Sequence, residues 1–321
     1  GLPLLGRTFG YAADRVRRME VVSADGRLRT VTPEGDPDLF FALLGGRDNF
    51  GVVTGLEIGL VPVTRIYGGG LYFGAEHVEE VLSAWRAWTD TVPDTMNSSI
   101  ALIPVPDAPV VAEPLRGKYV AHVRIAHTGP ADEGERLVAP LKAVAPRLLE
   151  TLGEMPYTDS AAIHNDPPMP MPWYAEDAML DDLVPSDVST ILKTVGPDAP
   201  VMCVTEVRHL GGALARPQGA PNAIGHRDAR YLLYVLSPLM GPFTPETVRP
   251  VQRQLFDAVA PRTQGRFLNF MGIGENAGPG QVRTAYDAET HERLTRLKAV
   301  HDPSNTFRAN YNLPPASAAD A

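Results

Sequence analysis

A strand-like segment of alternating residues carries the side chains best suited to chemistry. Glu206 and Arg208 share one face of the segment 202–210, which runs to the glycine pair 211–212, because side chains two apart in a strand point the same way. If the two are buried together, Arg208 would orient an anionic or oxygen-rich substrate and Glu206 would accept a proton. The simpler interpretation is a charge pair on a half-exposed strand. Tyr234 in the next strand-like segment is a third candidate, although a tyrosine there is more often a core residue.

A glycine-rich loop is the second feature that could serve a ligand. The apolar run 39–44 ends at Gly45 and Gly46, and a short polar loop leads into the β-branched residues 52–54. Adjacent glycines remove Cβ atoms where the backbone turns sharply or approaches a ligand closely. The nearby N–H groups could then bind an anionic or polar cofactor. The alternative is that the glycines only end the helix in the usual way.

Composition and charge exclude several classes of protein. The chain has 321 residues, a net charge of -9, 21% charged and 44% hydrophobic residues, which is ordinary for a folded protein. Dispersed charge with an acidic excess argues against binding nucleic acid or an anionic membrane. The sequence has no run of eighteen apolar residues, so no membrane span is predicted. The single cysteine, Cys203, excludes an internal disulfide, and the histidines have no metal-ligand spacing.

The elements that position these residues alternate between strand and helix patterns. Asp25 and Gly26 form a hairpin-type turn, and the segment 36–38 with Asp38 is typical of a helix start. The Pro- and Met-rich segment 166–174 is expected to be a loop. Strands are expected at 19–22, 28–31, 51–61, 70–73, 119–124, 202–210 and 231–236, and helices at 78–89, 131–152, 245–259 and 288–300. Pro140 and Pro146 are expected to kink or divide the helical region 131–152.

Three separated segments resemble flavoprotein oxidases of the berberine bridge enzyme-like group, within the vanillyl-alcohol oxidase superfamily: Leu39–Thr54, Gly211–Tyr231 and Arg293–Pro315. The resemblance implies an α+β fold. Part of a PCMH-type FAD-binding domain would combine with a substrate domain that has a large antiparallel sheet backed by helices. The implied division is FAD domain at 1–62, substrate domain at 63–275, and a segment at 276–321 that returns to the FAD domain.

The resemblance also implies FAD as the cofactor and a set of residues that contact it. For the asparagines the alternatives are a buried amide satisfied by backbone and simple anchoring of the C-terminal tail. The implied contacts are Gly45, Gly46, Asn49, Phe50, Gly51, Val53, Asn269, Asn310 and Asn312.

The chain departs from the family pattern in two respects. The family's pyrophosphate-binding loop, with the histidine that bonds covalently to flavin, would precede Gly1, so the chain is expected to correspond to the C-terminal two-thirds of an oxidase. Cys203 does not match the second attachment residue. The positions of the usual tyrosine and glutamate bases are Phe270 and Leu232, neither of which can take a proton. Glu206, Arg208 and Tyr234 therefore remain the catalytic candidates.

The function implied is that of an FAD-dependent oxidoreductase. A hydride would pass from a carbon bearing oxygen or nitrogen in a small molecule to flavin N5, and O2 would be the electron acceptor of an oxidase. The alternative is a non-catalytic homologue that binds a small molecule without flavin. A cytoplasmic location is expected. Expressed alone, the chain is expected to aggregate, because apolar surface on residues 1–62 would lack its cover.

Overall fold

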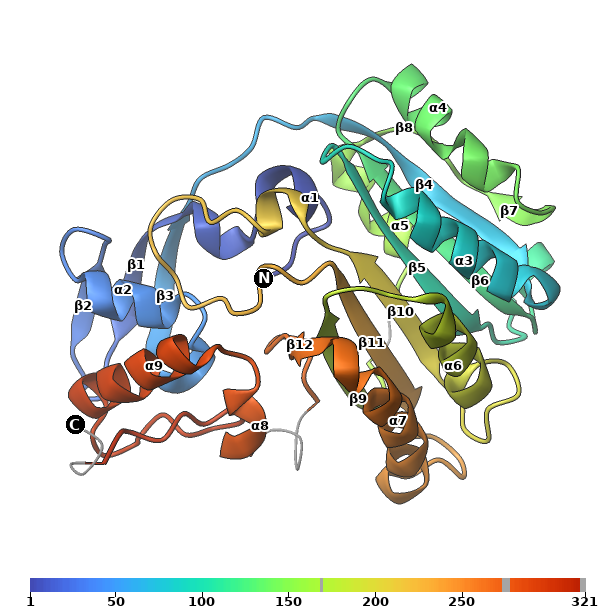
Figure 1. Cartoon of the computed structure of the whole chain (residues 1–321). Coiled ribbons are helices and arrows are strands. Elements are labelled where there is room, and N and C mark those ends of the chain that lie inside the picture. The colour runs from blue at the N-terminus through green and yellow to red at the C-terminus, as the bar shows by residue number, and fades with distance from the viewer. Residues whose placement is uncertain (168–169, 273–277, 318–321) are drawn as a thin grey trace.

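The computed structural model describes residues 1–167, 170–272 and 278–317, and it contains two β-sheets that lie side by side. Figure 1 shows a small sheet with two helices at the left and a large sheet with its helices at the right, with the N-terminus between them. The small sheet uses residues 16–58 and the large sheet residues 65–265. The division into domains stays a prediction, and its second boundary lies outside the described residues.

The small sheet has strands β1 (Val16–Val22), β2 (Leu28–Val31) and β3 (Val52–Ile58) in the antiparallel order β2-β1-β3. Helix α2 (Pro37–Leu43) begins at Asp36, whose carboxylate accepts a hydrogen bond from the backbone N–H of Leu39 at 3.1 Å, as is typical of a helix N-cap. Asp38 lies in the first turn. Apolar residues of the segments 19–50 and 268–313 share one core here.

Helix α9 (Ala288–His301) joins the C-terminal segment to this small sheet through a buried cation. The ammonium of Lys298 pairs with Asp302 at 2.6 Å and donates to the carbonyl oxygens of Asn49 and Phe307, each at 2.7 Å. Lys298 and Asp302 are both fully buried. Because a buried charge is costly unless it is paired and hydrogen-bonded, this cluster holds the loop after α2 against the end of the chain.

The large sheet confirms the predicted fold class, with mixed helices and a nine-stranded antiparallel sheet. Its order is β12-β9-β11-β10-β5-β6-β4-β7, and β8 also pairs with β4. The strands are β4 (Arg65–Gly74), β5 (Met96–Pro104), β6 (Tyr119–His127), β7 (Arg147–Glu150), β8 (Gly153–Pro156), β9 (Trp173–Leu180), β10 (Val204–His209), β11 (Tyr231–Pro238) and β12 (Thr263–Gly265).

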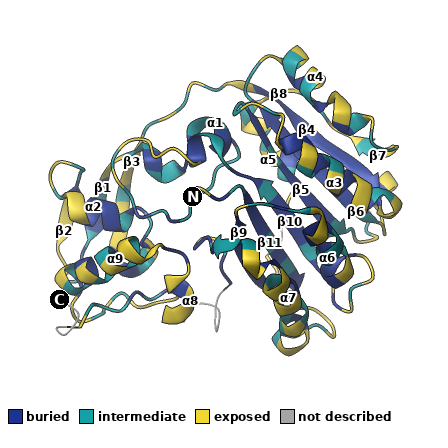
Figure 2. Cartoon of the chain, in the orientation of Figure 1, coloured by how far each residue is buried: buried dark blue, intermediate teal, exposed yellow. Residues whose placement is uncertain are grey.

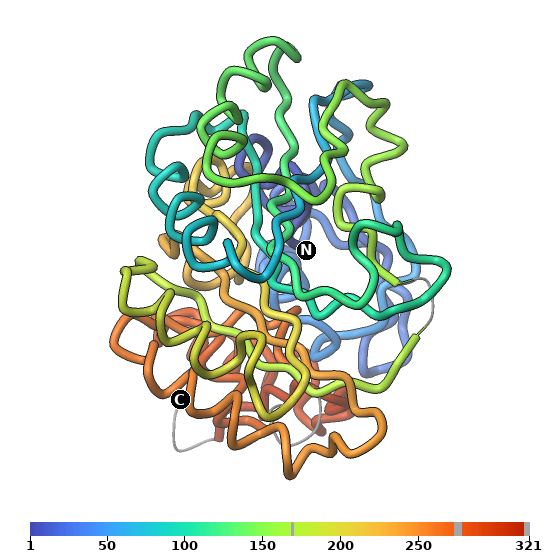
Figure 3. The backbone as a smooth tube through the Cα atoms, turned by 90° about the vertical axis from the view of Figure 1, so that its right-hand side faces the viewer, coloured from blue at the N-terminus to red at the C-terminus, as the bar shows by residue number. Residues whose placement is uncertain are grey.

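Four helices cover one face of the large sheet and leave the other face for the site. They are α3 (Val78–Thr89), α4 (Ala131–Lys142), α6 (Pro185–Val195) and α7 (Pro245–Val259), and their coils lie one above another in the perpendicular view (Figure 3). Trp85 and Leu82 of α3 pack on strand residues such as Ile100 and Val123. The exposed residues gather on the outer sides of these helices (Figure 2).

Two predictions about elements were wrong. The predicted helical region 131–152 ends at Lys142, with Pro140 inside the helix. The chain breaks before Pro146 as expected, but the residues after it form β7 and not a second helix, because the edge of β4 offers them partners. The predicted loop 166–174 ends earlier, since β9 begins at Trp173. The remaining short helices are α1 (Gly6–Phe9), α5 (Ala161–His164) and α8 (Pro279–Arg283), with single 3-10 turns at Ala12–Arg15, Arg47–Asn49, Ala75–His77, Glu113–Leu115, Tyr157–Asp159, Gly212–Leu214 and Ala260–Arg262.

Candidate active site

A row of polar side chains crosses the large sheet on the face opposite the four helices. His122 of β6 is paired with Ala101 of β5, Ala101 with Glu206 of β10, Glu206 with Tyr234 of β11, and Tyr234 with Asp177 of β9. Directly opposed residues of neighbouring strands have their side chains on the same face, about 5 Å apart. The antiparallel register therefore collects four titratable groups from four strands.

Glu206 is held by two arginines at the centre of this row. Its carboxylate pairs with Arg124 at 2.8 Å and with Arg208 at 2.9 Å, and His164 lies 3.7 Å away. Burial alone would raise the pKa of Glu206, but the charges of Arg208 and Arg124 outweigh it and lower this pKa to about 2. A carboxyl group with so low a pKa stays ionised and is a weak base. The environment therefore argues for a charge that fixes the arginines and against the predicted role of proton acceptor.

Two histidines beside Glu206 and its two arginines are neutral near pH 7. Burial and the charge of Arg124 lower the pKa of His164 to about 4 and that of His122 well below its ordinary value. The His122 ring stacks on Tyr72 with centroids 3.9 Å apart, and its Nε2 occupies the space that a Cβ on Gly70 would need. The described part of the chain contains no cluster of three or more histidine, cysteine or acidic side chains that could hold a metal ion.

Arg208 and Tyr234 meet the same aromatic ring. The guanidinium of Arg208 lies 4.8 Å from the centre of the Phe270 ring. The Tyr234 ring meets the Phe270 ring edge-on, with their centroids 5.1 Å apart. Burial and the nearby carboxylates Asp177 and Glu206 raise the pKa of Tyr234, so this phenol stays protonated. It can donate a hydrogen bond but is a poor base at neutral pH.

Asp177, which sequence reasoning did not single out, is the one acid of this row whose pKa lies near neutrality. Its side chain is 1% exposed, and its Oδ2 accepts a hydrogen bond from the backbone N–H of Phe267 at 2.6 Å. Its Oδ1 is buried without a hydrogen-bond partner among the described residues. Burial raises the pKa of Asp177 to about 7. The available signal in the sequence was an acidic pair inside the apolar segment 173–180.

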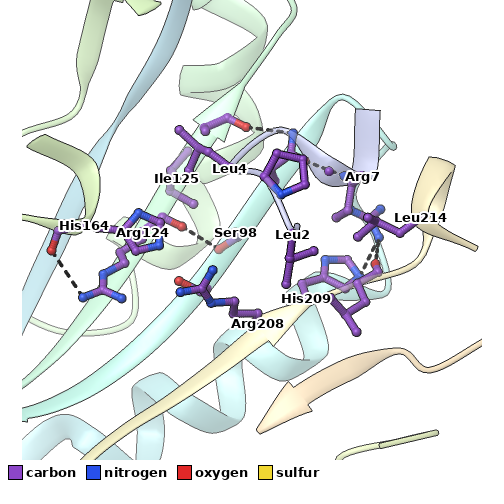
Figure 4. Close-up of a pocket in the computed structure, with 16 residues that line it drawn as sticks. Leu2, Leu4, Arg7, Ser98, Arg124, Ile125, His164, Arg208, His209 and Leu214 are labelled. Carbon is purple, nitrogen blue, oxygen red and sulfur yellow. Dashed lines mark hydrogen bonds between the residues drawn. The ribbon is translucent and has the colours of Figure 1, made fainter. Parts of the chain in front are cut away.

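The N-terminal segment covers part of this polar face and leaves a chamber beneath it (Figure 4). Arg7 fixes the segment to the sheet: its backbone N–H donates to Asn97 Oδ1 at 2.8 Å and its Nε to the carbonyl of Met96 at 2.9 Å. An inner pocket of about 40 Å³ adjoins a wider opening of about 640 Å³. Both are lined by Leu2, Leu4, His164 and Arg208.

A second cavity, of about 330 Å³, lies between the small sheet and the segments 223–225, 267–269 and 285–286. Three of the predicted flavin contacts line it, namely Gly45, Val53 and Asn269, together with apolar residues of β1 and β3. Val53 and Leu56 of β3, which both line it, are 44% and 56% exposed. This cavity is therefore bounded by an apolar strand on one side and by the loop before Phe270 on the other.

The other predicted contacts lie outside the lining of that cavity. Asn49 is buried, and its amide ties the loop to the C-terminal tail: Nδ2 donates to the carbonyl of Tyr311 and Oδ1 accepts from the N–H of Leu313, each at 2.8 Å. Phe50 is also fully buried. Asn310 is exposed, with a φ of 58°, and the buried Oδ1 of Asn312 has no partner among the described residues. Their roles at a cofactor stay predictions.

Close packing explains the glycines of the loop. A Cβ on Gly45, which has a φ of 134°, would lie 2.5 Å from the backbone of Ala223. A Cβ on Gly46 would lie 2.5 Å from the ring of Phe50, and one on Gly51 would lie 2.5 Å from Val21. Since real Cβ atoms do not approach other atoms so closely, all three positions require glycine for reasons within the protein.

Comparisons with known proteins confirm the resemblance to FAD-linked oxidases of the berberine bridge enzyme-like group. No family model matches the chain. The uncharacterized FAD-linked oxidoreductase YgaK of Bacillus subtilis is 27% identical over 324 residues, which cover 98% of this chain and 68% of YgaK. The chain is thus a relative of the FAD-linked oxidoreductases.

Solved structures agree on the fold. The 6-hydroxy-D-nicotine oxidase of Arthrobacter nicotinovorans superposes with a TM-score of 0.79 at 22% identity, covering 98% of this chain and 70% of that one. The berberine bridge enzyme-like protein 1 of Physcomitrella patens gives a TM-score of 0.78 at 16% identity, with 98% and 68% covered. The chain spans about two thirds of the length of the relatives it matches. None of the helices in the described part of the chain has the length and apolar character that crossing a membrane requires.

Proposed function

We propose that this chain forms the substrate side and part of the cofactor site of an FAD-dependent oxidase. The reaction would remove a hydride from a carbon that bears oxygen or nitrogen in a small molecule, with O2 as the electron acceptor. The observation that carries the proposal is the cavity of about 330 Å³ beside the small sheet. One of its walls is the loop that leads to Phe270, whose ring contacts Arg208 and Tyr234 of the polar row. Relatives named as FAD-linked oxidoreductases support FAD as the cofactor.

The residues around this cavity fit the flat ring of a flavin. Val16, Met19 and Ile58 give an apolar wall, and the exposed polar residues Arg47 and Asn269 line the same space. An amide and a guanidinium can bond to the carbonyl and nitrogen edge of a heterocycle, and the volume lies at the lower end of the range for small-molecule sites. The cavity therefore suits the ring portion of the cofactor.

The chain's own groups would position the substrate and take up its proton. FAD, when bound, supplies the acceptor for the hydride. Glu206 stays ionised and fixes the direction of Arg208, while Tyr234 keeps its proton and can donate a hydrogen bond to a substrate oxygen. Asp177 is the group in the row that can change its protonation near neutral pH. We therefore infer that Asp177, beside Tyr234, takes up the proton in place of the missing family bases.

Titration of the purified chain with FAD tests the proposal through the quenching of flavin fluorescence. The wild-type chain is expected to bind FAD saturably. Val53→Asp places a carboxylate on the wall of the cavity, and we expect it to weaken binding at least roughly tenfold, since an unpaired charge next to an apolar ring is costly. Val110→Asp is the control, because Val110 is 90% exposed and lies outside the lining of the cavity.

A wild-type chain that takes up no FAD would overturn the proposal for this chain and would favour the non-catalytic alternative. Equal binding by the Val53→Asp and wild-type chains would show that FAD binds elsewhere. In the loaded protein, release of hydrogen peroxide in air-saturated buffer would separate an oxidase from a dehydrogenase.

A further inference from the structure

We propose that the chamber under the N-terminal segment binds the carboxylate of a small organic acid and that Arg208 is the residue that holds it. This inference rests on the proposed function, since it names the chemical class of the substrate at the same site. It is carried by the balance of charge in the chamber, by buried polar atoms that lack partners, and by the shape of the space.

Around Glu206 the chamber has one more positive charge than negative charges. Arg7 also lines the inner pocket, but it is paired separately with Asp94 at 3.4 Å. Two guanidinium groups, Arg124 and Arg208, share the single carboxylate of Glu206, while His122 and His164 are uncharged near pH 7. Asp166 stands at the outer opening and is exposed, so water screens its charge. The side chains of Arg124 and Glu206 are each 8% exposed, and that of Arg208 is 21% exposed. Because an excess charge with so little contact with water is costly without a counter-ion, the chamber favours an anion.

The two arginines differ in what they can still offer. All three nitrogens of Arg124 have partners: Glu206 at 2.8 Å, the carbonyl of His164 at 3.3 Å and the ring of His122 at 3.3 Å. Arg208 bonds Glu206 through Nη2, and its buried Nε has no hydrogen-bond partner among the described residues. Arg208 is thus the arginine that remains able to bind a ligand.

A neighbouring hydroxyl is also unsatisfied. Ser99 is 5% exposed, lines the inner pocket, and is paired across the strands with both Arg124 and Arg208. Its Oγ has no hydrogen-bond partner among the described residues. Because native proteins pair nearly all buried polar atoms, two unpaired donors on one wall indicate a missing acceptor. A carboxylate has two oxygens that can accept from both.

The shape of the space separates the acid group from the rest of the molecule. The inner pocket has a volume of about 40 Å³. One water needs about 10–15 Å³, so the pocket has room for a group the size of a carboxylate. The wider opening of about 640 Å³ accepts an organic body between Leu2, Leu4 and Ala161. Arg208 also stacks on Phe270, so an acid held there lies beside the loop that lines the proposed flavin cavity.

Calorimetric titration of the FAD-free chain with benzoate tests this inference, with benzamide as the neutral probe of the same shape. We expect benzoate to bind at least roughly tenfold more tightly than benzamide, because a charge-assisted hydrogen bond contributes more than a neutral one. Arg208→Gln should weaken benzoate binding by roughly tenfold to a hundredfold and leave benzamide binding unchanged. Arg65→Gln is the matched control, since Arg65 also pairs with a glutamate but is exposed outside the chamber.

Circular dichroism checks that each variant is folded. Arg208→Lys is the second variant: it keeps the positive charge beside Glu206 but removes Nε, so an intermediate loss of benzoate affinity is expected. Equal affinity for benzoate and benzamide, or full benzoate affinity in both Arg208 variants, would overturn the inference. FAD titration of the same proteins is independent of these results: a chain that binds FAD but does not prefer benzoate refutes only the acid site, and the reverse result refutes only the flavin site.

Discussion

Replacing Asp177 by asparagine gives the sharpest test of the electrostatics of this site. Burial raises the pKa of Asp177 from 3.8 to about 7 in the folded chain. Between these two values the unfolded chain releases a proton that the folded chain keeps, so the free energy of unfolding falls as the pH rises. The loss is complete above pH 7, and the difference in pKa corresponds to about 4 kcal/mol.

Asparagine does not titrate, and its carbonyl oxygen can still accept the hydrogen bond from Phe267. The free energy of unfolding of Asp177→Asn, relative to wild type, should therefore increase by about 4 kcal/mol between pH 4 and pH 8. The variant is expected to be no more stable than wild type at pH 4 and clearly more stable at pH 8. Urea denaturation at each pH measures this, with the exposed Asp107→Asn as the control. A difference that does not change with pH would refute the raised pKa and remove Asp177 as the proton acceptor.

Three further changes test the packing that supports the site. Lys298→Met leaves Asp302 buried and unpaired and should lower the free energy of unfolding by about 3–5 kcal/mol in urea denaturation. Gly45→Ala forces an overlap at positive φ and should destabilise the chain by more than about 1 kcal/mol, whereas Gly280→Ala, where a Cβ meets nothing within 4 Å, should be neutral in thermal melts. Leu56→Lys on exposed β3 should reduce self-association, as measured by light scattering.

Local patterns predicted the elements well where one face of a segment is apolar. The alternation in 202–210 and the stripe of Val81, Leu82, Trp85 and Trp88 both correspond to observed elements. The prediction failed at residues 147–150, where apolar residues spaced like a helix in fact pair with β4. Helical and strand periods give similar patterns over so short a run. Only the edge of β4, far away in the sequence, decides between them.

The candidate site was less predictable because its contacts are long-range. The pair Glu206 and Arg208 was visible, since two residues on one strand face need no tertiary information. Arg124 was not, because it is 82 positions from Glu206 and the register of three strands brings the two together. Asp177 was missed for a related reason: the sequence shows an acid in an apolar strand, but only the fold shows that one of its oxygens is left without a partner.

Packing within the protein explains the glycine loop. A Cβ on its three glycines would overlap with Ala223, Phe50 and Val21, so the absence of a Cβ at each is explained without a ligand. The loop leads into β3, whose exposed apolar side chains, Leu56 among them, form one wall of the cavity beside the small sheet. An exposed apolar edge strand is a liability that proteins normally cover. The strand after the glycines is therefore what suits this cavity to a flat apolar ring. Substitutions in β3 test this better than substitutions of the glycines, which would disturb folding first.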